Sequence, residues 1–219
     1  MTSPRRSFRV GVVSDTHVGD ALAELPPGVI TAFAGVDLIL HAGDITTIGV
    51  LDQLSGCAPV VAVQGNHDRA AGLELPAAVV VQIAGTRIGV SHGLRGRRTE
   101  TAAIAAGIIC GRPVLAGLGR SLIGRFGEVD CVVFGHFHMP YLTRIGRTTV
   151  FSPGAVYVAE SDPYNTAHGL RGRAYQRFRS GIPEAGRVAN VGILEISGGV
   201  VTPRIVPIGG ALRPASGPR

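Results

Sequence analysis

The chain has 219 residues, of which 45% are hydrophobic and 32 are glycine, a composition that excludes a disordered chain and favours an α/β or β-rich domain. The net charge is +6, and arginine carries all of the basic charge because the sequence contains no lysine. Such an arginine excess is either a compositional bias or an attraction for phosphate-bearing ligands.

The three cysteines are far apart and form no Cys-x-x-Cys pair, which argues against a disulfide framework or a zinc ribbon. The chain shows no leader-like start and no apolar run of 18 residues. From these features we expect a cytoplasmic protein without a membrane span.

The first part of the chain predicts alternating strands and helices. Three short apolar runs are typical of buried strands: residues 8–13, 36–41 and 60–63. Asp20 is in position to cap a helix, although Pro26 and Pro27 would break and restart it. A second helix is expected to start at the threonine pair 46–47. Strands that alternate with helices indicate a parallel sheet.

The pattern then changes to hairpins. Their paired strands are expected at residues 78–83 and 87–91, 141–145 and 148–152, and 188–196 and 200–207. Residues 99–110 are rich in alanine and isoleucine and are expected to be helical, and residues 131–134 resemble a further buried strand. Two arginine-rich connections, 94–129 and 160–187, fit the pattern less well, and structureless segments of that length are usually functional or disordered.

We find no internal repeat and no clear linker, so we expect one domain. The expected boundaries are a flexible start at 1–7, the domain at 8–208 and a flexible tail at 209–219. In the second arginine-rich segment, Arg171 and Arg173 are predicted to border the site and to select a substrate with extra phosphate or acidic groups. The alternative is a solvated arginine face.

Five polar clusters each follow an apolar run. They are Asp15-Thr16-His17, Gly43-Asp44, Gly65-Asn66-His67-Asp68, Ser91-His92-Gly93 and Gly135-His136-Phe137-His138. One such cluster alone also makes an ordinary turn. However, five of the seven histidines lie in them, and sites of open α/β sheets form beyond the carboxyl ends of the strands. The clusters therefore predict one shared site.

The side chains in these clusters that can bind a metal ion offer both nitrogen and oxygen donor atoms. The proposed ligands are Asp15, His17, Asp44, Asn66, His92, His136 and His138. A set without thiolate suits manganese, iron, zinc or nickel in a reactive centre better than a structural zinc site. Seven ligands are too many for one ion with an open position, but they suit two ions that share a bridging carboxylate.

As an ordered set, the clusters resemble the motifs of the calcineurin-like metallophosphoesterase superfamily. Those motifs are Asp-x-His, Gly-Asp, Gly-Asn-His-Asp/Glu, a His before Gly, and Gly-His-x-His, matched here over roughly residues 9–152. Within that superfamily, the chain is similar to the small bacterial and archaeal phosphodiesterases related to the retromer subunit. The resemblance implies a four-layer αββα sandwich of two mixed sheets flanked by helices.

The resemblance also implies a hydrolase that cleaves phosphodiesters by attack of a metal-bridging hydroxide, with manganese the first choice and iron, zinc or nickel as alternatives. One ion would be held by Asp15, His17 and His138, the other by Asn66, His92 and His136, with Asp44 bridging them. It implies that His67 is not a ligand but faces the substrate, with Asp68 close by. We expect His67 to protonate the leaving group and Asp68 to hold its ring.

Several alternatives stay open on the sequence. The same site could serve a phosphomonoesterase or a nucleotide pyrophosphatase, and the same fold could serve as a non-catalytic binding scaffold. A homodimer and a nucleic-acid substrate also stay open. Outside the motifs, His41 is either a buried structural histidine or a residue that orients a metal ligand.

Overall fold

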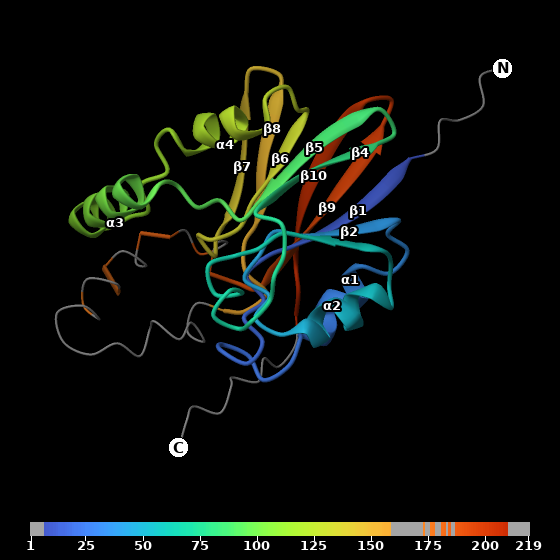
Figure 1. Cartoon of the computed structure of the whole chain (residues 1–219), viewed down its shortest axis with the longest axis horizontal. Coiled ribbons are helices and arrows are strands. Elements are labelled where there is room, and N and C mark those ends of the chain that lie inside the picture. The colour runs from blue at the N-terminus through green and yellow to red at the C-terminus, as the bar shows by residue number, and fades with distance from the viewer. Residues whose placement is uncertain are drawn as a thin grey trace.

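The computed structural model describes residues 7–158 and 187–209, together with residues 173, 176, 177, 181, 182 and 184. Two five-stranded sheets lie face to face, and helices flank them (Figure 1). The predicted α/β architecture of two mixed sheets flanked by helices is confirmed. Within the described residues, no helix is long and apolar enough to cross a membrane.

The first sheet contains the predicted parallel unit. Its strands, in spatial order, are β10 (Val200–Pro207), β9 (Asn190–Ser197), β1 (Phe8–Val13), β2 (Leu38–His41) and β3 (Val60–Ala62). The connections from β1 to β2 and from β2 to β3 contain α1 (Pro27–Ala32) and α2 (Ile48–Ser55). Strands β1, β2 and β3 are parallel, whereas β9 and β10 form an antiparallel hairpin against β1.

The second sheet is built from the other two predicted hairpins and one central strand. Its order is β4 (Ala78–Ile83), β5 (Thr86–Ser91), β6 (Cys131–Val133), β8 (Thr148–Pro153) and β7 (Pro140–Ile145). Strand β6 runs parallel to both β5 and β8, so the carboxyl ends of β5 and β6 lie at the same edge. The connection from β5 to β6 contains α3 (Arg97–Cys110) and α4 (Leu118–Phe126).

Alternation along the strands builds the four layers. In β1, Val10 and Val12 lie in the core between the sheets, whereas Val13 lies in the core that also contains Val29 of α1 and Leu54 of α2. The same alternation occurs in β6. Cys131 and Val133 lie between the sheets, and Val132 lies in the core with Leu118 and Leu122 of α4. Successive side chains of a strand point to opposite faces, so each central strand serves two cores.

Two sequence predictions differ from the structure. No helix starts at Asp20, because the carbonyl of His17 accepts the N–H groups of Asp20, Ala21 and Leu22 and closes a tight turn there. Helix α4 was not predicted, since residues 94–129 were interpreted as one poorly patterned connection. Its signal was the spacing of Leu118 and Leu122, which are four residues apart and pack on one face.

Candidate metal centre

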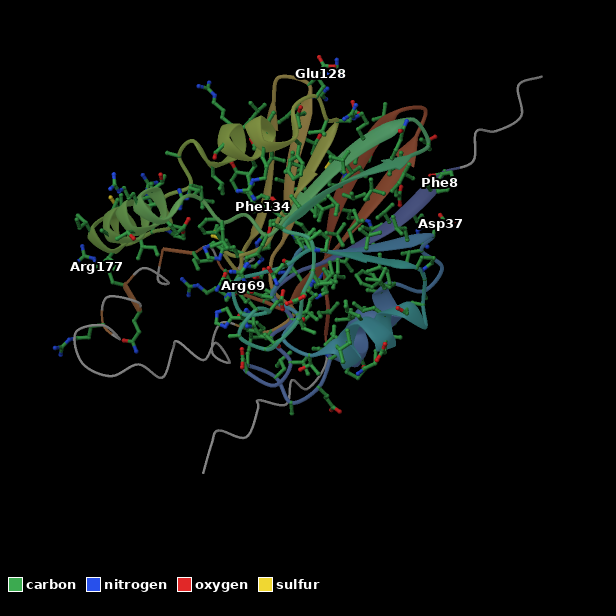
Figure 2. The ribbon with its side chains drawn as sticks, viewed as in Figure 1. Phe8, Asp37, Arg69, Glu128, Phe134 and Arg177 are labelled. Carbon is green, nitrogen blue, oxygen red and sulfur yellow. The ribbon has the colours of Figure 1, made fainter. Side chains whose placement is uncertain are left out.

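The proposed ligands lie in loops at one edge of the two sheets. In chain order the loops follow β1 (Asp15, His17), β2 (Asp44), β3 (Asn66), β5 (His92) and β6 (His136, His138). The ends of β1, β2 and β3 are level, because Val13 pairs with His41 and His41 pairs with Ala62. Figure 2 marks two of these loops with Arg69, just after the β3 motif, and Phe134, just before the β6 motif.

Four of the predicted ligands form a compact group. Side-chain ligand atoms of Asp15, His17, Asp44 and His138 all lie within 4.8 Å of one another. Asp15, His17 and Asp44 are buried, and both ring nitrogens of His17 are buried without a hydrogen-bond partner among the described residues. Buried polar atoms are normally paired, so this orphaned imidazole fits a position that a metal ion would fill.

Asp44 lies between two imidazoles that come from different sheets. Its Oδ2 atom is 3.4 Å from Nε2 of His17 and 3.1 Å from Nε2 of His92. Its Oδ1 atom accepts the backbone N–H of His67 at 2.8 Å. Burial raises the pKa of Asp44, but the close imidazoles of His17 and His92 outweigh burial and hold that pKa well below its ordinary value. Asp44 is therefore a carboxylate.

The pKa values of His17 and His92 shift in the opposite direction to that of Asp44. Burial lowers the pKa of His92, but the hydrogen bond to Asp44 and the charge of Asp15 outweigh it and raise that pKa to about 9. Burial also lowers the pKa of His17, but the nearby carboxylates of Asp44 and Asp15 outweigh it and raise that pKa. The centre thus carries a concentrated negative potential that stabilises cations.

The other three predicted ligands lie on the far side of Asp44. Nε2 of His92 is 3.0 Å from Oδ1 of Asn66, and the rings of His92 and His136 have centroids 5.2 Å apart. Nδ1 of His92 is 2.8 Å from the carbonyl oxygen of Ala42. A carbonyl can only accept, so Nδ1 carries the proton and Nε2 faces Asn66 and Asp44.

The backbone at the site is strained. Five of the seven predicted ligands have positive φ: Asp15 (53°), His17 (44°), Asp44 (56°), His136 (76°) and His138 (53°). Such conformations cost of order 1–3 kcal/mol each in residues other than glycine, and they persist where the surrounding structure enforces them. Part of that enforcement comes from Asp15 and His17, whose N–H groups donate to the carbonyls of Gly43 and Asp44 at 2.9 and 3.1 Å.

Glycines let these loops approach one another closely. A Cβ atom at Gly65 would collide with the carboxylate and backbone nitrogen of Asp44. A Cβ atom at Gly135 would lie 2.7 Å from Oδ2 of Asp15. Both glycines precede a predicted ligand, so the Gly-Asn and Gly-His steps of the motifs have a steric cause.

Asp68 was predicted to hold the ring of His67, and the structure corrects this. Its Oδ1 atom accepts the N–H groups of Ile45 and Thr46 at 2.6 and 2.8 Å. Its Oδ2 atom accepts those of Asp44 and Gly65 at 3.0 and 2.7 Å. Asp68 is fully buried, so it fastens the β2 and β3 loops together and is not available to a substrate.

The carboxylate next to His67 belongs to Asp20. Oδ2 of Asp20 is 3.5 Å from Nδ1 of His67 and 3.8 Å from Nδ1 of His17. The ring of His67 lies edge-on to that of His17 with centroids 4.8 Å apart, and its side chain is 26% exposed. The sequence signal was present, since Asp20 follows His17 by one helical turn's spacing, but we assigned it to a helix cap.

Sequence reasoning missed two other residues at the site. The hydroxyl of Tyr157 is 2.7 Å from Nδ1 of His138, and Oε1 of Glu100 is 3.5 Å from Nε2 of His136. Burial raises the pKa of Glu100, but hydrogen bonds to His136 and Arg95 outweigh it and lower that pKa to about 2. Neither residue belongs to a motif, so only the tertiary structure brings them to the site.

The remaining residues named from the sequence are two arginines and His41. Arg173 is exposed, and Arg171 lies outside the described residues. A role for this pair in substrate choice stays a prediction. Among the described residues, His41 makes no hydrogen bond to the side chain of a predicted ligand. Instead its Nδ1 atom accepts the N–H of Gly43 at 3.2 Å, and its Nε2 atom is 3.2 Å from Oγ1 of Thr16.

Comparison with known proteins identifies relatives. Residues 8–168 match the calcineurin-like phosphoesterase superfamily domain. A protein of Methanothermobacter thermautotrophicus named "Probable metallophosphoesterase" is 36% identical over 155 residues, which make up 70% of this chain and 81% of that protein.

Solved structures share the fold at lower identity. Vps29 of Entamoeba histolytica in complex with zinc is 18% identical, with a TM-score of 0.60 over 91% of this chain and 99% of that chain. A structure described as a novel archaeal phosphodiesterase is 17% identical, with a TM-score of 0.52 over 91% of this chain and 100% of that chain. Both likenesses concern the fold.

The role of Asp68 can be tested by Asp68→Asn in metal-free protein. The amide loses the negative charge and places N–H groups opposite backbone donors, so the free energy of unfolding in urea should fall by about 3 kcal/mol. Asp130→Asn is the matched control, because Asp130 accepts a single backbone N–H, from Arg87. Equal losses in the two variants would contradict the role of Asp68 as a fastener of two loops.

His41 predicts a pH dependence of stability. Burial lowers its pKa to about 4, whereas the unfolded value is 6.5. Between these values the unfolded state binds more protons, so this contribution to the free energy of unfolding is full above pH 6.5 and is lost as the pH falls towards 4. From pH 7 to pH 5, metal-free protein should lose about 2 kcal/mol more than a His41→Asn variant. The same pH dependence in both proteins would contradict this.

Proposed function

The chain belongs to the calcineurin-like phosphoesterase superfamily, and on that basis we propose that it hydrolyses phosphodiester bonds at a centre of two divalent metal ions. One observation carries the proposal. A single oxygen of the buried carboxylate Asp44 faces Nε2 of His17 at 3.4 Å and Nε2 of His92 at 3.1 Å. These imidazoles follow strands of the two different sheets, and this arrangement supports Asp44 as the ligand shared by two metal ions.

The residues around Asp44 divide between these positions. Asp15, His17 and His138 would hold one ion with Asp44, and Asn66, His92 and His136 would hold the other with Asp44. When bound, two such ions supply Lewis acidity to the phosphate and lower the pKa of a water between them. The nitrogen and oxygen donors suit manganese, our first choice, and also iron, zinc or nickel.

His67 would act on the leaving group. Hydrolysis of a phosphodiester expels an alkoxide, which needs a proton. Asp20 lies 3.5 Å from Nδ1 of His67 and would hold the ring in position to give a proton to the leaving group. The backbone holds His67 close to Asp44, since the N–H of His67 donates to Oδ1 of Asp44 at 2.8 Å.

Two other functions remain as alternatives. A phosphomonoesterase or nucleotide pyrophosphatase would use the same residues on a different ester, and a panel of diesters, monoesters and nucleotides separates these activities. The Vps29 fold likeness motivates a binding scaffold as the other alternative. No turnover of any of these esters by protein that carries two ions would favour the scaffold.

The metal centre predicts its own stoichiometry. Purified protein reloaded with Mn²⁺ should carry two ions per chain by elemental analysis, and Asp44→Ala should carry one at most because it removes a ligand from both positions. Asp52→Ala is the control, since Asp52 is an exposed carboxylate on α2. Full activity at one ion per chain, or two ions retained by Asp44→Ala, would contradict the shared bridge.

The acid role predicts a dependence on the leaving group. His67→Gln should lower kcat by about 10²–10⁴ for alkyl phosphodiesters and much less for nitrophenyl esters, whose leaving group departs without a proton. Asp20→Asn should show the same trend with a smaller loss, because Asp20 only positions the ring. Both variants should keep two ions. If His67→Gln lost an ion, or slowed both ester classes equally, His67 would not be the acid.

A further inference from the structure

Glu100 approaches the proposed ligand His136 from outside the metal centre. It lies in the first turn of α3, a helix that Figure 1 shows extending away from the sheets. Its Oε1 atom is 3.5 Å from Nε2 of His136. The side chain of Glu100 is only 13% exposed, so the contact is largely shielded from solvent.

Arg95 holds this carboxylate in place. Its Nε and Nη2 atoms donate to the two oxygens of Glu100 at 3.0 and 3.4 Å, and Nη1 donates to the carbonyl of Val114 at 3.1 Å. The guanidinium also lies over the ring of Phe137, 5.3 Å from its centroid, and the side chain is 6% exposed. Arg95 and Val114 flank α3, so Arg95 ties the two ends of the α3 segment to the residue next to His136.

Two of the other proposed ligand histidines, His92 and His138, show what such a contact does. Nδ1 of His92 is 2.8 Å from the carbonyl of Ala42, and its Nε2 faces Asp44. Nδ1 of His138 is 2.7 Å from the hydroxyl of Tyr157, and its Nε2 is 3.5 Å from Oδ1 of Asp15. In each ring one nitrogen has an outer partner and the other faces the centre, the usual arrangement of metal-binding histidines.

We propose that Glu100 is the outer partner of His136 and thus a positioning residue for the second metal position. The carboxylate accepts the Nε2–H of His136, which favours that tautomer and leaves the lone pair of Nδ1 for the ion. Arg95 fixes Glu100, so helix α3 becomes a supporting part of the centre. The inference rests on the two-metal centre of the proposed function and on no step of the hydrolysis.

Zinc binding to metal-free protein tests the energetic consequence. In calorimetric titrations, Glu100→Ala should weaken one of the two binding steps by about 10–100-fold and leave the other unchanged. Glu100→Gln, which keeps an acceptor oxygen, should lose less. Glu128→Ala is the control, because Glu128 is exposed and lies just before β6, at the end of that strand opposite His136 (Figure 2). Two unchanged binding steps in Glu100→Ala would overturn the proposal.

The tautomer can be read in the unmodified protein, where no variant can misfold. In the zinc-loaded chain, nitrogen NMR should show His136 with a proton on Nε2 and zinc on Nδ1. Zinc on Nε2 would overturn the proposal, as would a chain that binds a single ion. Neither measurement needs turnover. A protein that binds two ions in this way but cleaves no ester would therefore refute the proposed function and leave the role of Glu100 standing.

Discussion

The site depends on one buried carboxylate that never meets a substrate. Asp68 accepts four backbone N–H groups, three from the loop after β2 and one from the loop after β3. Charge-assisted bonds of this kind are about twice as strong as neutral ones, and here they are shielded from water. They hold Asp44 and Thr46 at positive φ and bring Gly65 against Asp44. These bonds thus fix the backbone of Asp44 and the start of the loop that carries Asn66 and His67.

The buried negative charge of the site is compensated by the histidines around it. Asp15 and Asp44 are buried carboxylates, and such groups are costly unless they are paired or bind cations. The same carboxylates raise the pKa values of His17 and His92, because they stabilise a positive charge on either imidazole. In the proposed metal centre, protons and metal ions would therefore compete for the same nitrogens, and metal binding would release protons.

Function also involves parts of the chain outside the motif loops. Asp20 comes from the tight turn after the first motif, Tyr157 from the segment after β8, and Glu100 from α3. Each of the three contacts a ring nitrogen of a motif histidine: Asp20 that of His67, Tyr157 that of His138 and Glu100 that of His136. A family motif fixes which side chains can bind metal, whereas these outer contacts fix the tautomer and orientation of the rings.

The sequence by itself determined the strands, their hairpins and the seven polar side chains that follow them, because apolar periodicity and turn residues are local signals. Parallel strands end at one edge, so these side chains could be expected to converge. Only the tertiary structure decided which group each nearby carboxylate contacts. Asp68 and Asp20 both lie within three residues of a motif histidine. The close packing of the loops after β2 and β3 directs the carboxylate of Asp68 to backbone N–H groups, whereas Asp20 is the carboxylate beside His67. The contact between Glu100 and His136 joins residues 36 positions apart through the fold of α3, and no local pattern encodes such a distance.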